Sequence, residues 1–206
     1  MKCDHRPIQE KQLVYPQYLT RFFFRLAVFL VILGCYVFYP QGLDLTRPWH
    51  QAGLFSPAHL LCLVMICSML AQHARRPGMS MGRMKQYRAF SDIDPTYNPA
   101  QLQAAKKQQN RGALKVLAVW LAGNAVIVLL FFRHYIGVAE LVVLCAFYYL
   151  SDMICILFFC PFQLFLMGNQ CCINCRIFAW GSWMMATPLV LIPSFLPAGV
   201  VLLSLT

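Results

Sequence analysis

Long apolar stretches alternate with short polar ones along this chain, and the pattern predicts helices that cross a membrane. A crossing helix needs about 20 mostly apolar residues. The candidate stretches lie at about 20–39, 57–73, 114–132, 138–160 and 177–205. We therefore expect an all-α, polytopic membrane protein, organised as a single membrane domain over residues 1–206 with about five transmembrane helices and short connections.

Prolines mark where several of these helices begin. Ser56 can cap and Pro57 can open the second stretch. Asn98 and Pro99 give the same signal ahead of a run of good helix formers. We expect one helix from about 99 to 132, the first part of which projects out of the membrane.

The last apolar stretch is interrupted by Pro188, Pro193 and Pro197. Proline removes a backbone hydrogen bond and kinks a helix, although membrane helices tolerate it when neighbouring groups compensate. We expect one long kinked helix over 177–205, and a broken or re-entrant pair is the alternative.

Basic residues are distributed unequally between the two ends of the predicted helices. The chain has 17 Lys+Arg against 7 Asp+Glu, a formal net charge of +10. With five helices, fifteen of the basic residues fall on one side, in or next to segments 1–25, 73–113 and 160–176, and only Arg47 and Arg133 fall on the other. Basic residues collect on the cytosolic side. We therefore expect a multi-pass protein of the cell membrane with a cytosolic amino terminus and an outside carboxyl terminus.

The basic cytosolic segment 73–113 has two interpretations. Basic side chains beside a bilayer attract anionic lipid headgroups, by about 1 kcal/mol each near the surface, or they serve only to orient the chain. A nucleic-acid partner is not expected, because no separate soluble domain could hold such a site. The residues predicted to contact headgroups are Arg75, Arg76, Lys106, Lys107 and Arg111.

Two acidic residues, Glu140 and Asp152, lie within a predicted helix. Hydrocarbon solvates a charge poorly, so such residues usually face protein or a water-filled cavity. We expect Asp152 to face the helix bundle, with Asn124 or a tyrosine of its own helix nearby. The group would be either a proton-linked or substrate site, or an interhelical polar contact. The predicted intramembrane polar residues are Asp152, Asn124, Glu140, Tyr148 and Tyr149.

The cysteine-rich loop 160–176, CPFQLFLMGNQCCINCR, is the main candidate for chemistry. Cys172 and Cys175 have the C-x-x-C spacing that many tetrahedral metal sites use. Thiols stay reduced in the cytosol and can then bind zinc or an iron–sulfur cluster. Redox exchange, acylation and plain packing are the alternatives. The predicted ligands are Cys160, Cys171, Cys172 and Cys175, with Cys155 as a substitute.

A second, weaker metal pattern consists of His59, Cys62 and Met65, which follow one another at intervals of three residues. Soft ligands at such spacing can bind copper. The three positions drift around the helix, however, because two steps of three fall short of two full turns. Packing is therefore the favoured interpretation of this pattern.

These features favour an accessory or structural membrane protein whose cysteine-rich loop binds zinc or an iron–sulfur cluster on the cytosolic face. One alternative is a membrane redox or lipid-modifying enzyme that uses the thiols and Asp152. No nucleophile elbow, phosphate loop or H-E-x-x-H motif is present in the sequence to support an enzyme. The other alternative is a small-solute transporter that acts as an oligomer. Besides the lipid bilayer, a homo-oligomer or a larger membrane complex is the expected partner.

Overall fold

The structure, a computed structural model, describes residues 7–46, 56–74, 99–166 and 180–204. These residues form helices and their connections, and none of them forms a strand. The predicted all-α class is thus confirmed for the described part of the chain. Its elements are α1 (Pro7–Phe38), η1 (Pro40–Leu43), α3 (Pro57–Ala74), α5 (Pro99–Phe132), α6 (Val138–Leu157), α7 (Pro161–Phe165), α9 (Trp180–Ala186), η2 (Thr187–Leu191) and α10 (Phe195–Ser204).

Among the residues described, three helices are long and apolar enough to cross a membrane. They are the stretches Pro16–Phe38 of α1, Asn110–Phe132 of α5 and Val138–Leu157 of α6. Helix α3 contributes a shorter apolar stretch, Pro57–Ala71. The molecule therefore has the composition of a helical membrane protein, but the expected number of about five crossing helices is not confirmed.

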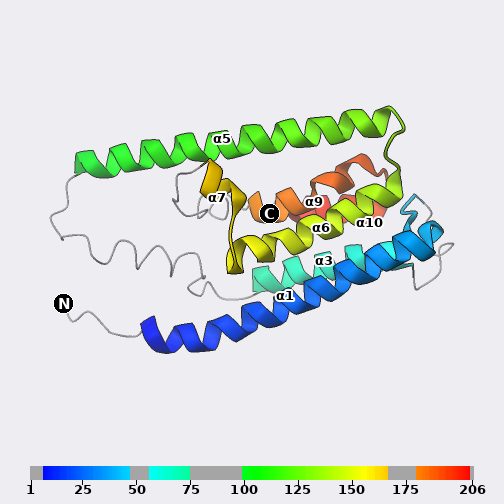
Figure 1. Cartoon of the computed structure of the whole chain (residues 1–206), viewed down its shortest axis with the longest axis horizontal. Helices are drawn as coiled ribbons and strands as arrows, with labels where there is room; N and C mark the ends of the chain where they lie inside the picture. The colour runs from blue at the N-terminus through cyan, green and yellow to red at the C-terminus, as the bar shows by residue number, and fades with distance from the viewer. Residues whose placement is uncertain (1–6, 47–55, 75–98, 167–179, 205–206) are drawn as a thin grey trace.

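Helix α6 lies at the centre of the bundle and α5 at its edge (Figure 1). Inside the molecule, 44% of the spanning stretch of α6 is buried, against 11% in α1 and in α5. We call the two ends of the bundle the Leu157 end and the Val138 end, after the last and first residues of α6. Helices α1 and α5 both extend past the rest of the bundle at the Leu157 end (Figure 1).

The contact between α1 and α6 is the most extensive in the bundle, and the two helices are antiparallel. Near the Leu157 end, the rings of Phe22 and Phe158 meet edge to face with centroids 5.4 Å apart. Near the Val138 end, the Tyr36 hydroxyl donates a 3.0 Å hydrogen bond to Glu140 Oε1. The register of α1 on α6 is therefore defined at both ends by side chains.

Helix α5 confirms the prediction of one continuous helix from 99 to 132. Pro99 occupies its first position, where the missing N–H would have had no partner in the helix. A helix of 34 residues is about 51 Å long at 1.5 Å per residue, which exceeds the bilayer core of about 30 Å. If Asn110–Phe132 crosses a membrane, the first part of α5 projects from it.

The final apolar stretch differs from the single kinked helix expected over 177–205. It is divided into α9, η2 and α10, as in the broken-pair alternative. Ile192 stands before Pro193 and has an extended backbone (φ −103°, ψ 108°), because a residue that precedes proline is forced out of the helical region. After this break, α10 packs back on α9, η2 and α3 and returns toward the Leu157 end (Figure 1).

This reversal predicts that a tag placed after Ser204 lies on the same side of the membrane as a tag placed before Pro7. The sequence pattern alone had indicated opposite sides. A tag inserted at 133–137, in the turn between α5 and α6, should lie on the other side and serves as the control. Protease digestion of each tagged protein in sealed vesicles measures this. Opposite sides for the first two tags would contradict the arrangement of α9 and α10.

Candidate functional site

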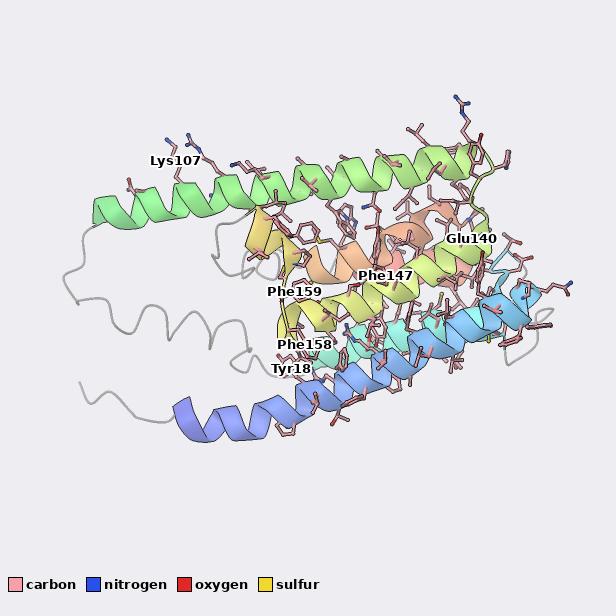
Figure 2. All side chains as sticks on the ribbon, in the orientation of Figure 1. Tyr18, Lys107, Glu140, Phe147, Phe158 and Phe159 are labelled. Carbon is pink, nitrogen blue, oxygen red and sulfur yellow. The ribbon has the colours of Figure 1, made fainter. Side chains whose placement is uncertain are left out.

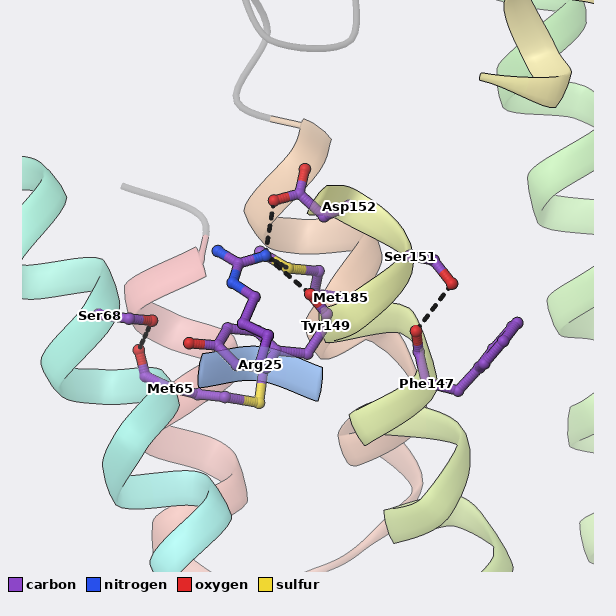
Figure 3. Close-up of polar contacts among 8 residues, drawn as sticks. All are labelled: Arg25, Met65, Ser68, Phe147, Tyr149, Ser151, Asp152 and Met185. Atoms are coloured by element: carbon purple, nitrogen blue, oxygen red, sulfur yellow. Dashed lines mark hydrogen bonds and ion pairs between the residues drawn. The ribbon is translucent and has the colours of Figure 1, made fainter. Parts of the chain in front are cut away.

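A buried ion pair joins α1 to α6 inside the bundle. Arg25 Nη1 donates a 2.7 Å hydrogen bond to Asp152 Oδ2 (Figure 3). The Arg25 side chain is 5% exposed and that of Asp152 is 20% exposed. Arg25 lies inside the spanning stretch of α1, and Asp152 lies inside that of α6. A charge inside a membrane helix is costly unless it is paired, so this pairing is what allows both residues to lie there.

Two further residues complete the surroundings of the guanidinium. Tyr149 is one turn before Asp152 on α6; its backbone oxygen accepts a 2.7 Å hydrogen bond from Arg25 Nη1, and its ring centroid is 4.0 Å from Arg25 Cζ. Met185 of α9 places its Sδ 3.8 Å from the same nitrogen. Arg25 thus contacts α6 and α9 at once, through an ion pair, a cation–π contact and a sulfur contact.

The spacing of residues along α6 explains why this face of the helix turns toward Arg25. Cys145, Tyr149 and Asp152 are separated by four and three residues, so they share one side of the helix. Tyr148, another of the predicted intramembrane polar residues, packs its ring on that of Trp120 of α5, with the two ring centroids 4.8 Å apart. The face toward the centre of the bundle is therefore the one that carries Tyr149, and Tyr148 faces the edge helix.

Asn124 does not serve as the partner that the sequence suggested for Asp152. Its side-chain nitrogen donates to the Trp120 backbone oxygen, one turn earlier on its own helix, at 2.8 Å. Glu140 lies at the opposite end of α6 from Asp152. There it accepts a 2.9 Å hydrogen bond from the backbone N–H of Gly137, the residue that precedes α6, besides the one from Tyr36. Glu140 therefore stabilises the start of α6 and its contact with α1.

Of the predicted metal ligands, only Cys155 and Cys160 lie among the described residues. Cys155 is half-buried on α6, and Cys160 is buried just before α7. Cys171, Cys172 and Cys175 lie outside the described residues. Within the described ranges, no group of three or more His, Cys, Asp or Glu side chains could hold a metal ion.

The predicted headgroup residues lie partly on the extension of α5. Lys107 stands on the part that extends beyond the bundle and is exposed (Figure 2), and Arg111, at the start of the spanning stretch, is exposed as well. Lys106 belongs to the same helix. Arg75 and Arg76 lie outside the described residues.

His59, Cys62 and Met65 do not converge as the weaker metal pattern would require. His59 Nδ1 is 2.9 Å from Ser56 Oγ, which also donates to the Gly42 backbone oxygen at 2.9 Å. Ser56 therefore fastens the start of α3 to η1, and His59 belongs to that contact. Cys62 and Met65 are instead fully buried in the core.

Arg25 is the residue of this site that the sequence analysis missed. From the sequence, Arg25 is only one of the basic residues that orient the chain. A signal was present, because Arg25 lies nine residues inside the stretch that begins at Pro16. A basic residue at that depth calls for an acidic partner in another helix. Of the two acidic residues inside a predicted helix, Glu140 and Asp152, Asp152 is the one that lies toward the same end of the bundle as Arg25.

Comparisons with models of known protein families, with characterised proteins and with solved structures find no match to this chain. Any statement about its function must therefore be argued from its own residues.

The ion pair predicts a strongly non-additive effect on stability. Asp152→Leu should destabilise the protein by about 3 kcal/mol, the lower end of the range for removing one partner of a buried pair, because Asp152 is partly exposed. Arg25→Leu combined with Asp152→Leu should restore part of that loss, since the Arg25 charge is then removed together with its carboxylate. Reversible unfolding in detergent micelles measures the free energy of each variant.

The matched control is Ser151→Ala. Ser151 is adjacent to Asp152 and bonds only the Phe147 backbone oxygen of its own helix, at 2.8 Å (Figure 3). Its removal should change the free energy of unfolding by less than about 1 kcal/mol. If the double variant loses as much stability as the two single variants together, the pair does not couple α1 to α6.

Proposed function

We propose that this chain is a multi-pass membrane protein of the accessory or structural kind, whose cysteine-rich loop 160–176 binds zinc or an iron–sulfur cluster on the cytosolic face. The observation that carries the proposal is the position of Arg25. Its partner Asp152 lies on the helix that precedes the loop, and its partner Met185 lies on the helix that follows it. One guanidinium thus fixes both helices that flank the loop.

A fixed separation between these two helices would favour metal binding by the loop. A metal site must hold its ligands within about 4 Å of one another, and the cost of closing a loop around a metal is smaller when the ends of the loop are already held. Asp152 is eight residues before Cys160, and Met185 is ten residues after Cys175. The anchoring contacts therefore lie close to the cysteines at both ends.

The use of Asp152 as an ion-pair partner favours this proposal over the enzymatic alternative. In that alternative, Asp152 and the thiols act on a substrate. Asp152 instead places a carboxylate oxygen 2.7 Å from Arg25 Nη1, and the same nitrogen is shared with Tyr149 and Met185. The geometry is that of a contact between helices.

The proposed orientation and partners follow from the surface of the helices. The outer side of α5 exposes large apolar residues, which a bilayer or a second protein would cover: Leu114, Val119, Leu121, Val126, Leu129 and Phe132. Before these residues, Lys107 on the extension of α5 and Arg111 at the start of the spanning stretch are exposed, where anionic headgroups would meet them. We propose that this extension and the amino terminus are cytosolic, because basic residues collect on that side.

Metal analysis of the purified protein tests the proposed function. We expect about one zinc ion or one iron–sulfur cluster per chain, and an iron–sulfur cluster would add broad visible absorption. Cys172→Ser and Cys175→Ser should each abolish metal retention. Cys67→Ser should retain it, because Cys67 is exposed on α3 and far from the loop in sequence. Protein that carries neither metal when purified without chelators would contradict the proposal.

A further inference from the structure

A second group of sulfur atoms lies inside the bundle, separate from the cysteine-rich loop. Cys145 Sγ of α6 is 3.6 Å from Met65 Sδ of α3 and 3.4 Å from the Met185 backbone oxygen of α9. Cys145 and Met65 are both fully buried. Sulfur atoms from two helices therefore meet in the interior, at the point where α3, α6 and α9 approach one another.

Cys62 adds a second thiol to this group. It lies one turn before Met65 on α3, is fully buried and belongs to the same core cluster. Cys62, Met65 and Cys145 are the three sulfur residues of what we call the core sulfur site.

The hydrogen bonds of Cys145 leave electron pairs facing one another in this site. A thiol has one proton, so Cys145 can donate to Met65 Sδ or to the Met185 oxygen at any moment, but not to both. When the proton points to the oxygen, lone pairs of two sulfur atoms face each other across 3.6 Å. A tetrahedral metal with metal–sulfur bonds of about 2.3 Å holds its sulfurs about 3.8 Å apart, so the observed separation suits two ligands of one ion.

The types of ligand and the net charge of the buried site together indicate which class of metal ion it would bind. Thiolate and thioether are soft ligands that favour copper(I). A monovalent ion bound to one thiolate adds no net charge, whereas a divalent ion would leave a positive charge in an apolar interior. That charge would also lie near Arg25, which contacts the side chain of Met185. Figure 3 shows Met65 and Met185 reaching toward the Arg25 region from opposite helices.

We propose that the core sulfur site binds a soft monovalent metal ion, copper(I) or silver(I), through the Cys145 thiolate and the Met65 thioether, while Cys62 stays a neutral thiol in the same core cluster. Binding displaces the Cys145 proton, so one proton is released for each ion that enters and the net charge of the site does not change. No change of metal oxidation state is involved. The site is distinct from the zinc or iron–sulfur loop of the proposed function.

One more buried methionine belongs to the same core cluster as the core sulfur site. Met69 follows Met65 by one turn of α3, toward the Leu157 end of the bundle.

Competition for copper(I) against a coloured chelator under anaerobic, reducing conditions tests the proposal. The full chain is used with Cys3 and the five predicted loop ligands, Cys155, Cys160, Cys171, Cys172 and Cys175, replaced by serine, so that these cysteines do not bind the ion. This background should bind one copper(I) with sulfur-only coordination in X-ray absorption. Cys145→Ala or Met65→Leu should weaken binding by at least tenfold, because even outer-shell changes cost about 10–100-fold in metal affinity.

Two comparisons separate loss of a ligand from loss of the fold. Met65→Leu conserves volume and should leave the metal-free unfolding midpoint nearly unchanged, and Cys67→Ala on α3 should leave copper affinity unchanged. In the otherwise unmodified chain, Cys145→Ala should reduce the bound copper(I) by one equivalent without changing zinc or iron content. Failure of the background to bind copper(I), or a copper(I) affinity unchanged from the background in Cys145→Ala or in Met65→Leu, would overturn the core sulfur site and leave the loop proposal untouched.

Discussion

The positive charge of Arg25 is the constraint on which the rest of this bundle depends. A guanidinium inside a spanning helix is stable only with a carboxylate and further hydrogen-bond acceptors around it. Arg25 Nη1 donates at 2.7 Å to Asp152 Oδ2 and to the Tyr149 backbone oxygen. That requirement fixes which face of α6 meets α1. With the register set there, Phe29 and Phe147 pack with centroids 6.2 Å apart. Further along the same contact, the Tyr36 hydroxyl reaches Glu140.

The same constraint extends to α9 and, through it, to the core. Met185 contacts Arg25 with its sulfur and accepts a hydrogen bond from Cys145 with its backbone oxygen. One residue therefore connects the charged pair to the buried sulfur atoms. Because Cys145 and Tyr149 share a face of α6, turning that face toward Arg25 also brings the Cys145 thiol toward α3.

Much of the helical framework could be predicted from local signals, and the contacts between helices could not. Pro99 and the helix formers after it are sufficient to define α5, and the apolar run from Val138 defines α6. The bond from Arg25 to Asp152 joins positions 127 residues apart, and no spacing rule links them. Asn124 of the preceding helix or a tyrosine of α6 was expected near Asp152; Asn124 bonds its own backbone instead, and Arg25 was not foreseen. Three prolines allowed either a kink or a break, and only the packing of α10 on α3 and α9 decides between them.

The cysteines show why residue type and spacing are insufficient to identify a metal site. Cys172 and Cys175 have a C-x-x-C spacing that can be recognised in the sequence. Cys145 and Met65 are 80 residues apart and come into contact only in the folded chain. His59 has the right spacing from Cys62, but its ring is used by Ser56 at the start of α3. A thioether is uncharged and costs little free energy to bury. A methionine can therefore lie in the core next to a thiol without the desolvation cost that a carboxylate or an imidazole would carry. A soft-metal site can therefore be built into an apolar bundle, but a hard-metal site needs the polar edge of the membrane.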